Sequence, residues 1–144
     1  MTAVIAFLLI VGGLGAATLT VAGFSPVRPL GQFQPDCAAP SRRFADPPER
    51  VVTAYAAGAA RVPGMKVAER QDRILLLDSR PTARIIGGDF GVAIRLTVMP
   101  ADSGSVVTAE AQNKTMGRTK LSTITELERE LRMAAKRAGI TELT

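Results

Sequence analysis

The chain opens with a long run of apolar positions. Between Ala3 and Phe24 there is no charged residue, and the only polar side chains are those of Thr18 and Thr20. About 22 residues at roughly 1.5 Å each form a helix about 33 Å long, which is enough to cross a hydrocarbon core of about 30 Å. The pattern predicts one N-terminal transmembrane helix over residues 1–25, with a small domain held at the membrane surface.

A cleaved secretory signal is the alternative interpretation of this run. Signals usually carry a basic n-region, an apolar core of about 7–15 residues and a cleavage site of small residues. No Lys or Arg precedes the run, and the run is longer than such a core, whereas Val21-Ala22-Gly23 is an acceptable cleavage site. We expect an uncleaved anchor and keep cleavage as the alternative.

The second half of the run carries a stripe of small residues. Gly12, Ala16 and Thr20 recur every four positions, which places them on one face of a helix. Small side chains let two membrane helices approach closely. We predict that this stripe packs against other membrane protein subunits; the alternative is that Gly and Ala are simply common in membrane helices.

Flanking charges predict the orientation of the anchor. The N-terminal flank offers only the α-amine, whereas Arg28, Arg42 and Arg43 follow the run. Because Lys and Arg near a span tend to stay in the cytoplasm, we expect a single-pass protein with a cytoplasmic domain. The periplasmic side stays open, since two of these three arginines lie about 18 residues beyond the span.

After the anchor, the sequence contains a proline-rich segment followed by a segment with helical periodicity. Residues 26–45 contain four prolines and predict a semi-rigid spacer. The domain is expected over residues 46–144, and it opens with a capping box in which Asp46 caps a helix and Glu49 follows three residues later. That helix runs to about Arg61. Its predicted inward residues are Val51, Tyr55, Ala59 and Val62, with Ala54 and Gly58 allowing close approach to a sheet.

Four strands are expected next, over residues 65–69, 73–78, 90–98 and 106–112. The first two flank a tight turn near Gln71-Asp72, and residues 82–86 fit either hairpin. The third strand is the clearest, because Val92, Ile94 and alternate residues after them share one face. Antiparallel pairing follows from one polar and one apolar face.

A final helix has a capping box at Thr123-Ile124-Thr125-Glu126 and ends at Gly139. Its apolar stripe is predicted to consist of Leu121, Ile124, Leu127, Leu131 and Ala134 or Ala135. The order of elements predicts an α+β domain, helix, four-strand antiparallel sheet, helix, with both helices on one sheet face.

The amino-acid composition limits the kinds of catalytic, metal and nucleic-acid sites that the chain could form. The single Cys37 allows no internal disulfide, and the absence of His removes the commonest general base and zinc ligand. We therefore expect no enzyme, no cofactor and no metal. The net charge is +5 but aromatic residues make up only 4%, which argues against base stacking and against a nucleic-acid partner. A basic domain beside an anionic lipid bilayer is the simpler explanation of the charge.

Three cations lie between the last strand and the last helix. Lys114, Arg118 and Lys120 are a candidate patch for an anionic ligand such as phosphate or a lipid head group. The alternative is a solvated loop without a ligand.

Residues 35–137 resemble a bacterial and plastid family known as domain of unknown function fourteen-ninety-nine. The resemblance rests on landmarks in the same order: Pro35-Asp36-Cys37, Val62 to Val67, Asp89 to Arg95, Gln112-Asn113-Lys114, and Gly117 to Leu121. The chain departs from the family where Thr119-Lys120-Leu121 replaces a Ser-Asp-Leu run. The resemblance implies a fold rather than an activity. For the anchored protein we expect the bacterial inner membrane as the location.

Together these observations predict a non-enzymatic, membrane-anchored accessory subunit that docks on a larger membrane protein assembly. The alternative is a membrane-proximal binding module for lipid head groups or a small apolar ligand.

Overall fold

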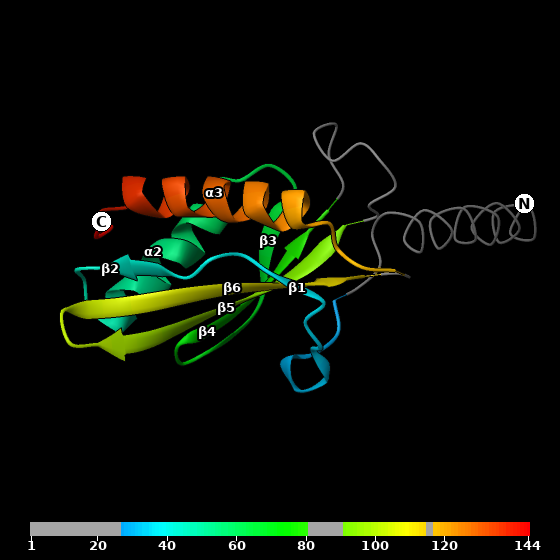
Figure 1. Cartoon of the computed structure of the whole chain (residues 1–144), viewed down its shortest axis with the longest axis horizontal. Helices are drawn as coiled ribbons and strands as arrows, with labels where there is room; N and C mark the ends of the chain where they lie inside the picture. Colours follow the sequence, from blue (N-terminus) through cyan, green and yellow to red (C-terminus); the bar gives the residue numbers. More distant parts are fainter. Residues whose placement is uncertain (1–26, 81–90, 115–116) are drawn as a thin grey trace, which may run out of the picture.

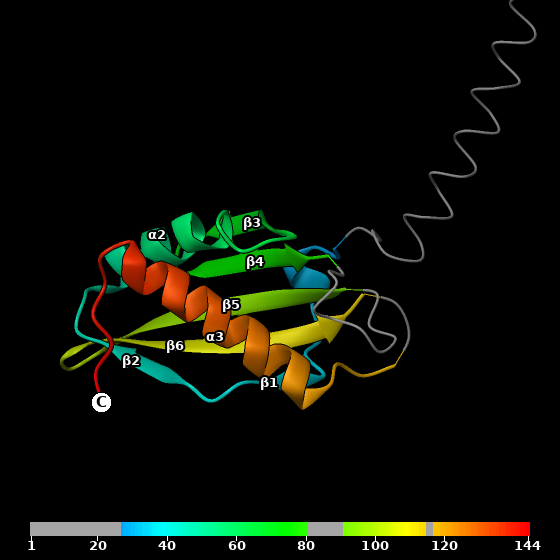
Figure 2. The same ribbon diagram turned by 90° about the horizontal axis from the view of Figure 1, so that it is seen from above.

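The computed structural model describes residues 27–80, 91–114 and 117–144 of the chain. They form an α+β domain in which two helices cover one face of a six-stranded antiparallel sheet (Figures 1 and 2). The predicted α+β class of the domain is confirmed. The elements are η1 (Leu30–Gln32), β1 (Cys37–Ala38), β2 (Arg42–Phe44), α2 (Pro48–Ala59), β3 (Met65–Gln71), β4 (Ile74–Ser79), β5 (Val92–Ala101), β6 (Gly104–Asn113) and α3 (Leu121–Arg137).

The long β5–β6 hairpin is the centre of the sheet, whose strand order is β1-β6-β5-β4-β3. The short strands β1 and β2 both pair with β6, along its outer edge. The hairpin turn closes at the Ala101–Gly104 pair. Gly104 has a φ of 144°, and a Cβ there would lie 2.0 Å from the Phe44 carbonyl oxygen, so no larger residue fits.

The main core lies between the sheet and the two helices. Strand β5 turns alternate residues toward the helices, and Val92, Ile94 and Leu96 are fully buried there. The four predicted inward residues of the first helix are buried as expected, and Tyr55 meets Phe44 edge-on with ring centroids 5.8 Å apart. Periodicity thus identified the apolar faces correctly.

The predicted spacer is part of the domain, which corrects both the four-strand count and the domain boundary at residue 46. Within residues 26–45, β1 and β2 form antiparallel pairs with β6, and Phe44 is fully buried. Strands of two and three residues are too short to display a period of two, so their sequence looks like a linker. What holds them is the free edge of β6, which lies far away in sequence.

Neither predicted capping box forms. Helix α2 begins at Pro48 without a side-chain cap, because the Asp46 carboxylate instead accepts a hydrogen bond of 2.7 Å from the Thr141 amide. Helix α3 begins at Leu121, two residues before Thr123, also without a side-chain cap. Gly139 does follow its end, with a φ of 109°.

The apolar stripe of α3 differs from the prediction at two positions. Leu121 is 62% exposed and lies outside the core, whereas Glu128 is buried within the stripe. Gly58 also has a different neighbour from the predicted one, because it approaches α3 rather than the sheet.

Several predictions concern residues outside the described ranges. These are the transmembrane span 1–25 with Gly12, Ala16 and Thr20, and the ambiguous segment 82–86. Within residues 27–80, 91–114 and 117–144, the structure contains no helix that is both long enough and apolar enough to span a bilayer.

Candidate functional site

The face of the sheet that the helices leave open is partly covered by residues 27–33, here called the strap. Phe33 of the strap is 7% exposed and packs with Leu76 and Ala93, and Val27 and Leu30 pack against the same cluster. These contacts form a second, smaller apolar cluster on the side of the sheet opposite the main core.

Polar contacts fix the strap as well. The Leu30 amide donates a hydrogen bond of 3.1 Å to the Glu69 carboxylate on β3. The Arg95 guanidinium lies 4.8 Å from the centroid of the Phe33 ring, which is a cation–π distance, and the same guanidinium pairs with Glu110 at 2.8 Å. The first described residues of the chain are therefore attached to the domain by both apolar and charged contacts.

The structure separates the three predicted patch residues. The Lys114 ammonium lies 2.6 Å from an Asp78 carboxylate oxygen, and the Lys114 side chain is only 1% exposed. Arg118 and Lys120 are exposed. Lys114 therefore does not contribute to a surface patch with them, and its charge serves the interior of the fold. The sequence correctly placed these three residues between the last strand, β6, and the last helix, α3. It could not show that Asp78 of β4 lies next to Lys114.

Asp36 organises the connection that carries Arg118. One carboxylate oxygen accepts a 2.8 Å hydrogen bond from the Asn113 amide, and the other accepts a 3.1 Å hydrogen bond from the Thr119 amide. The two amides lie on either side of Arg118, at the end of β6 and just before α3. The half-buried Asp36 carboxylate thus holds both ends of the connection.

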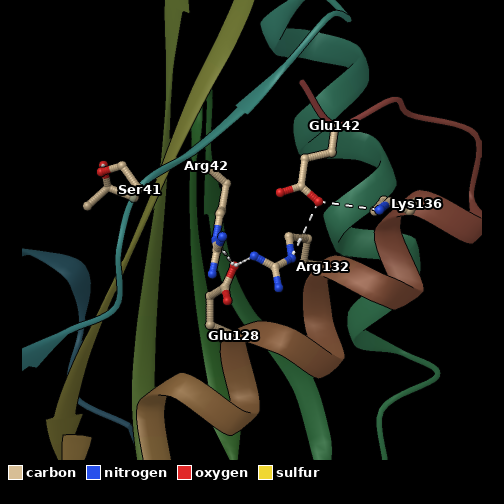
Figure 3. A network of polar contacts seen from close by, with 7 residues as sticks. Ser41, Arg42, Glu128, Arg132, Lys136 and Glu142 are labelled. Atoms are coloured by element: carbon tan, nitrogen blue, oxygen red, sulfur yellow. Dashed lines mark hydrogen bonds and ion pairs between the residues drawn. The ribbon is translucent and has the colours of Figure 1, made fainter. Parts of the chain in front are cut away.

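A buried ionic network joins β2, α3 and the C-terminal segment (Figure 3). Glu128 on α3 lies between Arg42 of β2, at 3.5 Å, and Arg132 of α3, at 3.4 Å. Glu142 in the C-terminal segment lies 3.7 Å from Arg132 and 3.3 Å from Lys136. Figure 3 shows Glu128 between the two guanidinium groups, with Glu142 beyond Arg132.

Burial dominates the electrostatics of this network. It raises the pKa of Glu128, and the nearby Arg132 and Arg42 charges offset only part of the effect. Burial also raises the pKa of Tyr55, with Glu128 acting in the same direction. The Tyr55 hydroxyl has no hydrogen-bond partner within the part of the chain that the structure describes.

A buried carboxylate with a raised pKa is a candidate acid–base group in many proteins. Here the Glu128 side chain is only 4% exposed, so a solute could reach it only if β2 or α3 moved. The network accordingly has a structural role, because its ion pairs hold β2, α3 and the C-terminal segment together. The sequence alone did not indicate this network, because an acid in the first half of a helix is ordinarily explained by the helix dipole.

Comparison of the chain with family models, with curated proteins and with solved structures finds no match. The family resemblance of residues 35–137 stays a prediction. Among the residues that the structure describes, no three His, Cys, Asp or Glu side chains lie together in a way that could hold a metal ion. The strap and the distribution of charge over the domain are therefore the features that bear on function.

Proposed function

We propose that this protein is a non-enzymatic accessory subunit, anchored in the bacterial inner membrane by residues 1–25 and docked on a larger membrane protein assembly. The observation that supports it is the strap. Val27, two residues after the end of the proposed anchor, already packs on the open face of the sheet. The domain therefore begins where the apolar run stops, with no free spacer between them.

The missing spacer has a physical consequence. A flexible linker of about 20 residues would let the domain range over roughly 25 Å. The strap removes this freedom, because Phe33 and Leu30 hold the chain to the sheet immediately after the anchor. A domain joined so closely to its anchor would stay near the membrane surface, as an accessory subunit needs to do.

The proposed anchor supplies the lateral contact. Gly12, Ala16 and Thr20 form a stripe of small residues that suits close packing against a helix of another subunit. The arginine at position 28 and those at 42 and 43 favour a cytoplasmic domain.

Co-purification of the full chain from bacterial membranes tests the proposal. The unaltered protein should resist carbonate extraction, keep its N-terminal mass and carry partner subunits in mild detergent. The variant Gly12→Leu/Ala16→Leu should stay in the membrane yet lose most of its partners, because larger side chains push the helices apart. The matched control Leu14→Ile/Val21→Ile changes residues that a helical run places on the face opposite the stripe, and it should retain them.

Two results would count against the proposal. A mature N-terminus near Phe24 would show that the run is a cleaved signal. Equal partner recovery from the stripe variant and the unaltered chain would show that the small residues serve no contact. Protease added to intact spheroplasts tests the orientation separately, since it should leave a cytoplasmic domain undigested.

A further inference from the structure

Several exposed cations lie at one end of the sheet. This end is marked by the paired residues Met65–Ser79, Ser79–Val92 and Val92–Asn113. Helix α3 begins at this end, and the C-terminus lies at the opposite end (Figure 1). The exposed cations here come from the strap, β3, the end of β4 and the connection before α3. They are Arg28, Lys66, Arg80, Arg118 and Lys120, and together they are called the basic end.

Two described acids near the basic end, Asp36 and Asp78, make contacts within the fold. Asp36 accepts two backbone hydrogen bonds, and Asp78 pairs with the buried Lys114. Among the described residues, Arg28, Lys66 and Arg118 make no ion pair with any acid. Their charge is therefore directed to the surface.

Several cations at the opposite end of the domain have acidic neighbours, although Arg43 and Arg137 there are exposed and have no ion pair within the described residues. Arg73 lies 3.2 Å from Glu49, and Lys136 lies 3.3 Å from Glu142. Arg50 lies 3.8 Å from Asp46. Three cations at the opposite end are thus paired with acids, whereas Arg28, Lys66 and Arg118 at the basic end are not.

An exposed apolar side chain accompanies the basic end. Leu121, the first residue of α3, is 62% exposed and follows Lys120 directly. An isolated surface leucine is ordinary. Next to cations it has the composition of surfaces that lie in the head-group region of a bilayer, where apolar groups enter the boundary and basic groups meet anionic lipid.

The strap connects this end to the proposed anchor. Arg28, the second described residue, lines a small cavity with Asn113 and Lys114 at the end of β6. The chain therefore enters the domain at the basic end, and an anchor that stops near residue 25 brings this end to the membrane.

We propose that the basic end rests on the anionic lipid head groups of the leaflet, with Leu121 in the head-group boundary. This inference rests on the proposed membrane anchor and adds the orientation of the domain. Anionic lipid attracts each basic side chain near the surface, and this attraction falls off within a Debye length. The opposite end then points away from the bilayer and is free for other subunits.

Single-tryptophan fluorescence tests the orientation, because the chain contains no Trp. Leu121→Trp places a fluorophore at the basic end, and Met99→Trp places one at a site 55% exposed on β5 near the opposite end. Both variants of the full chain would be reconstituted in vesicles of phosphatidylglycerol and phosphatidylcholine with nitroxide-labelled head groups. We expect at least twofold stronger quenching for Leu121→Trp than for Met99→Trp.

Charge controls complete the experiment. In the Leu121→Trp background, Arg28→Gln/Lys66→Gln/Arg118→Gln should lower the quenching at least twofold, as should vesicles of phosphatidylcholine alone. The matched variant Arg50→Gln/Arg73→Gln/Lys136→Gln removes three cations from the opposite end and should leave the quenching unchanged.

Flotation of the vesicles separates the two proposals. Protein that floats with the vesicles but is quenched equally at both positions would retain the anchor and overturn the orientation. Equal losses of quenching in the two triple variants would also overturn it. Protein that does not float would overturn the anchor, and the orientation with it.

Discussion

Gly58 of α2 lies directly against the backbone of Ala135 in α3. A Cβ added to Gly58 would stand 2.9 Å from the Ala135 amide nitrogen and 3.1 Å from the Ala134 Cβ. These are shorter than ordinary van der Waals separations, so the missing side chain sets how closely the two helices pack.

Gly58→Ala is therefore expected to destabilise the domain. The gain in helix propensity is about 1 kcal/mol, whereas forcing a methyl group into a packed contact costs about 1–3 kcal/mol. Because the closest atoms belong to the backbone of α3, we expect the steric cost to prevail. Urea unfolding followed by pulse proteolysis of the full chain in mild detergent measures the change. Gly31→Ala is the control, since a Cβ there meets nothing within 4 Å.

The buried pair of Lys114 and Asp78 makes a second prediction. Lys114→Met should lower the free energy of unfolding by about 3–5 kcal/mol, because it leaves the Asp78 carboxylate buried without its cation. Asp78→Asn should have a comparable effect. The double variant should lose less than the sum of the two single losses, by about 1 kcal/mol or more, in a double-mutant cycle. Simple additivity would contradict the pairing.

Stability should depend on pH through Glu128. Its ordinary pKa is 4.5, and burial raises the pKa in the folded chain. As pH rises, the unfolded chain therefore releases this proton before the folded chain does. The Glu128 contribution to stability is then fully present below about pH 4.5 and is lost as pH rises through the folded-state pKa.

Glu128→Gln removes this titration. The free energy of unfolding of the unaltered chain, measured relative to Glu128→Gln, should fall between pH 4.5 and the folded-state pKa and then level off. Glu126→Gln, on the exposed side of the same helix, controls for the loss of one carboxylate. A relative stability that rises with pH over this interval would contradict the sign of the pKa shift.

Arg132 should contribute more to stability than the exposed Arg129 of the same helix. Arg132→Met leaves the buried Glu128 carboxylate with Arg42 alone and removes the contact with Glu142. Breaking one partner of a buried ion pair costs about 3–5 kcal/mol. Arg129→Met removes a guanidinium that is 57% exposed and should cost less than about 1 kcal/mol. Pulse proteolysis of both variants at neutral pH checks the order.

Loss of the Phe33 side chain should both destabilise the domain and loosen the strap. Phe33→Ala should cost about 3 kcal/mol, the lower end of the range for a buried phenylalanine, because its cluster is small. Amides of residues 27–33 should then exchange hydrogen faster, while those of the main core change much less. Val67→Ala, at a position already 37% exposed, is the control. Unchanged exchange in the strap would mean that Phe33 does not hold it.

Local patterns were sufficient for much of the architecture. The alternation around Val92 and Ile94 marked a half-buried strand, and the spacing of Val51 and Tyr55 marked the inner face of a helix. A period of two or of 3.6 is visible over a few residues, because it reflects only which side of the element meets the core. The turn near Asp72, which has a φ of 45°, was equally local.

Local sequence patterns did not predict the contacts between residues that are far apart in the chain. Asp46 looked like a helix cap but binds the amide of Thr141, 95 residues away, and Asp36 binds amides 77 and 83 residues away. A carboxylate can accept a hydrogen bond either from an amide at the start of its own helix or from an amide of a remote segment. The choice depends on which backbone segment the fold brings near, and no local pattern encodes that.

The sequence by itself determined the α+β class, the apolar faces of α2 and β5, and the extended apolar run at the N-terminus. Only the tertiary structure decided that the spacer becomes edge strands and a strap, that Lys114 is buried, and that Glu128 lies between two arginines. The physical reason is that burial of apolar faces follows from short-range periodicity. The partner of a charge, or of a free strand edge, is fixed only when remote segments meet.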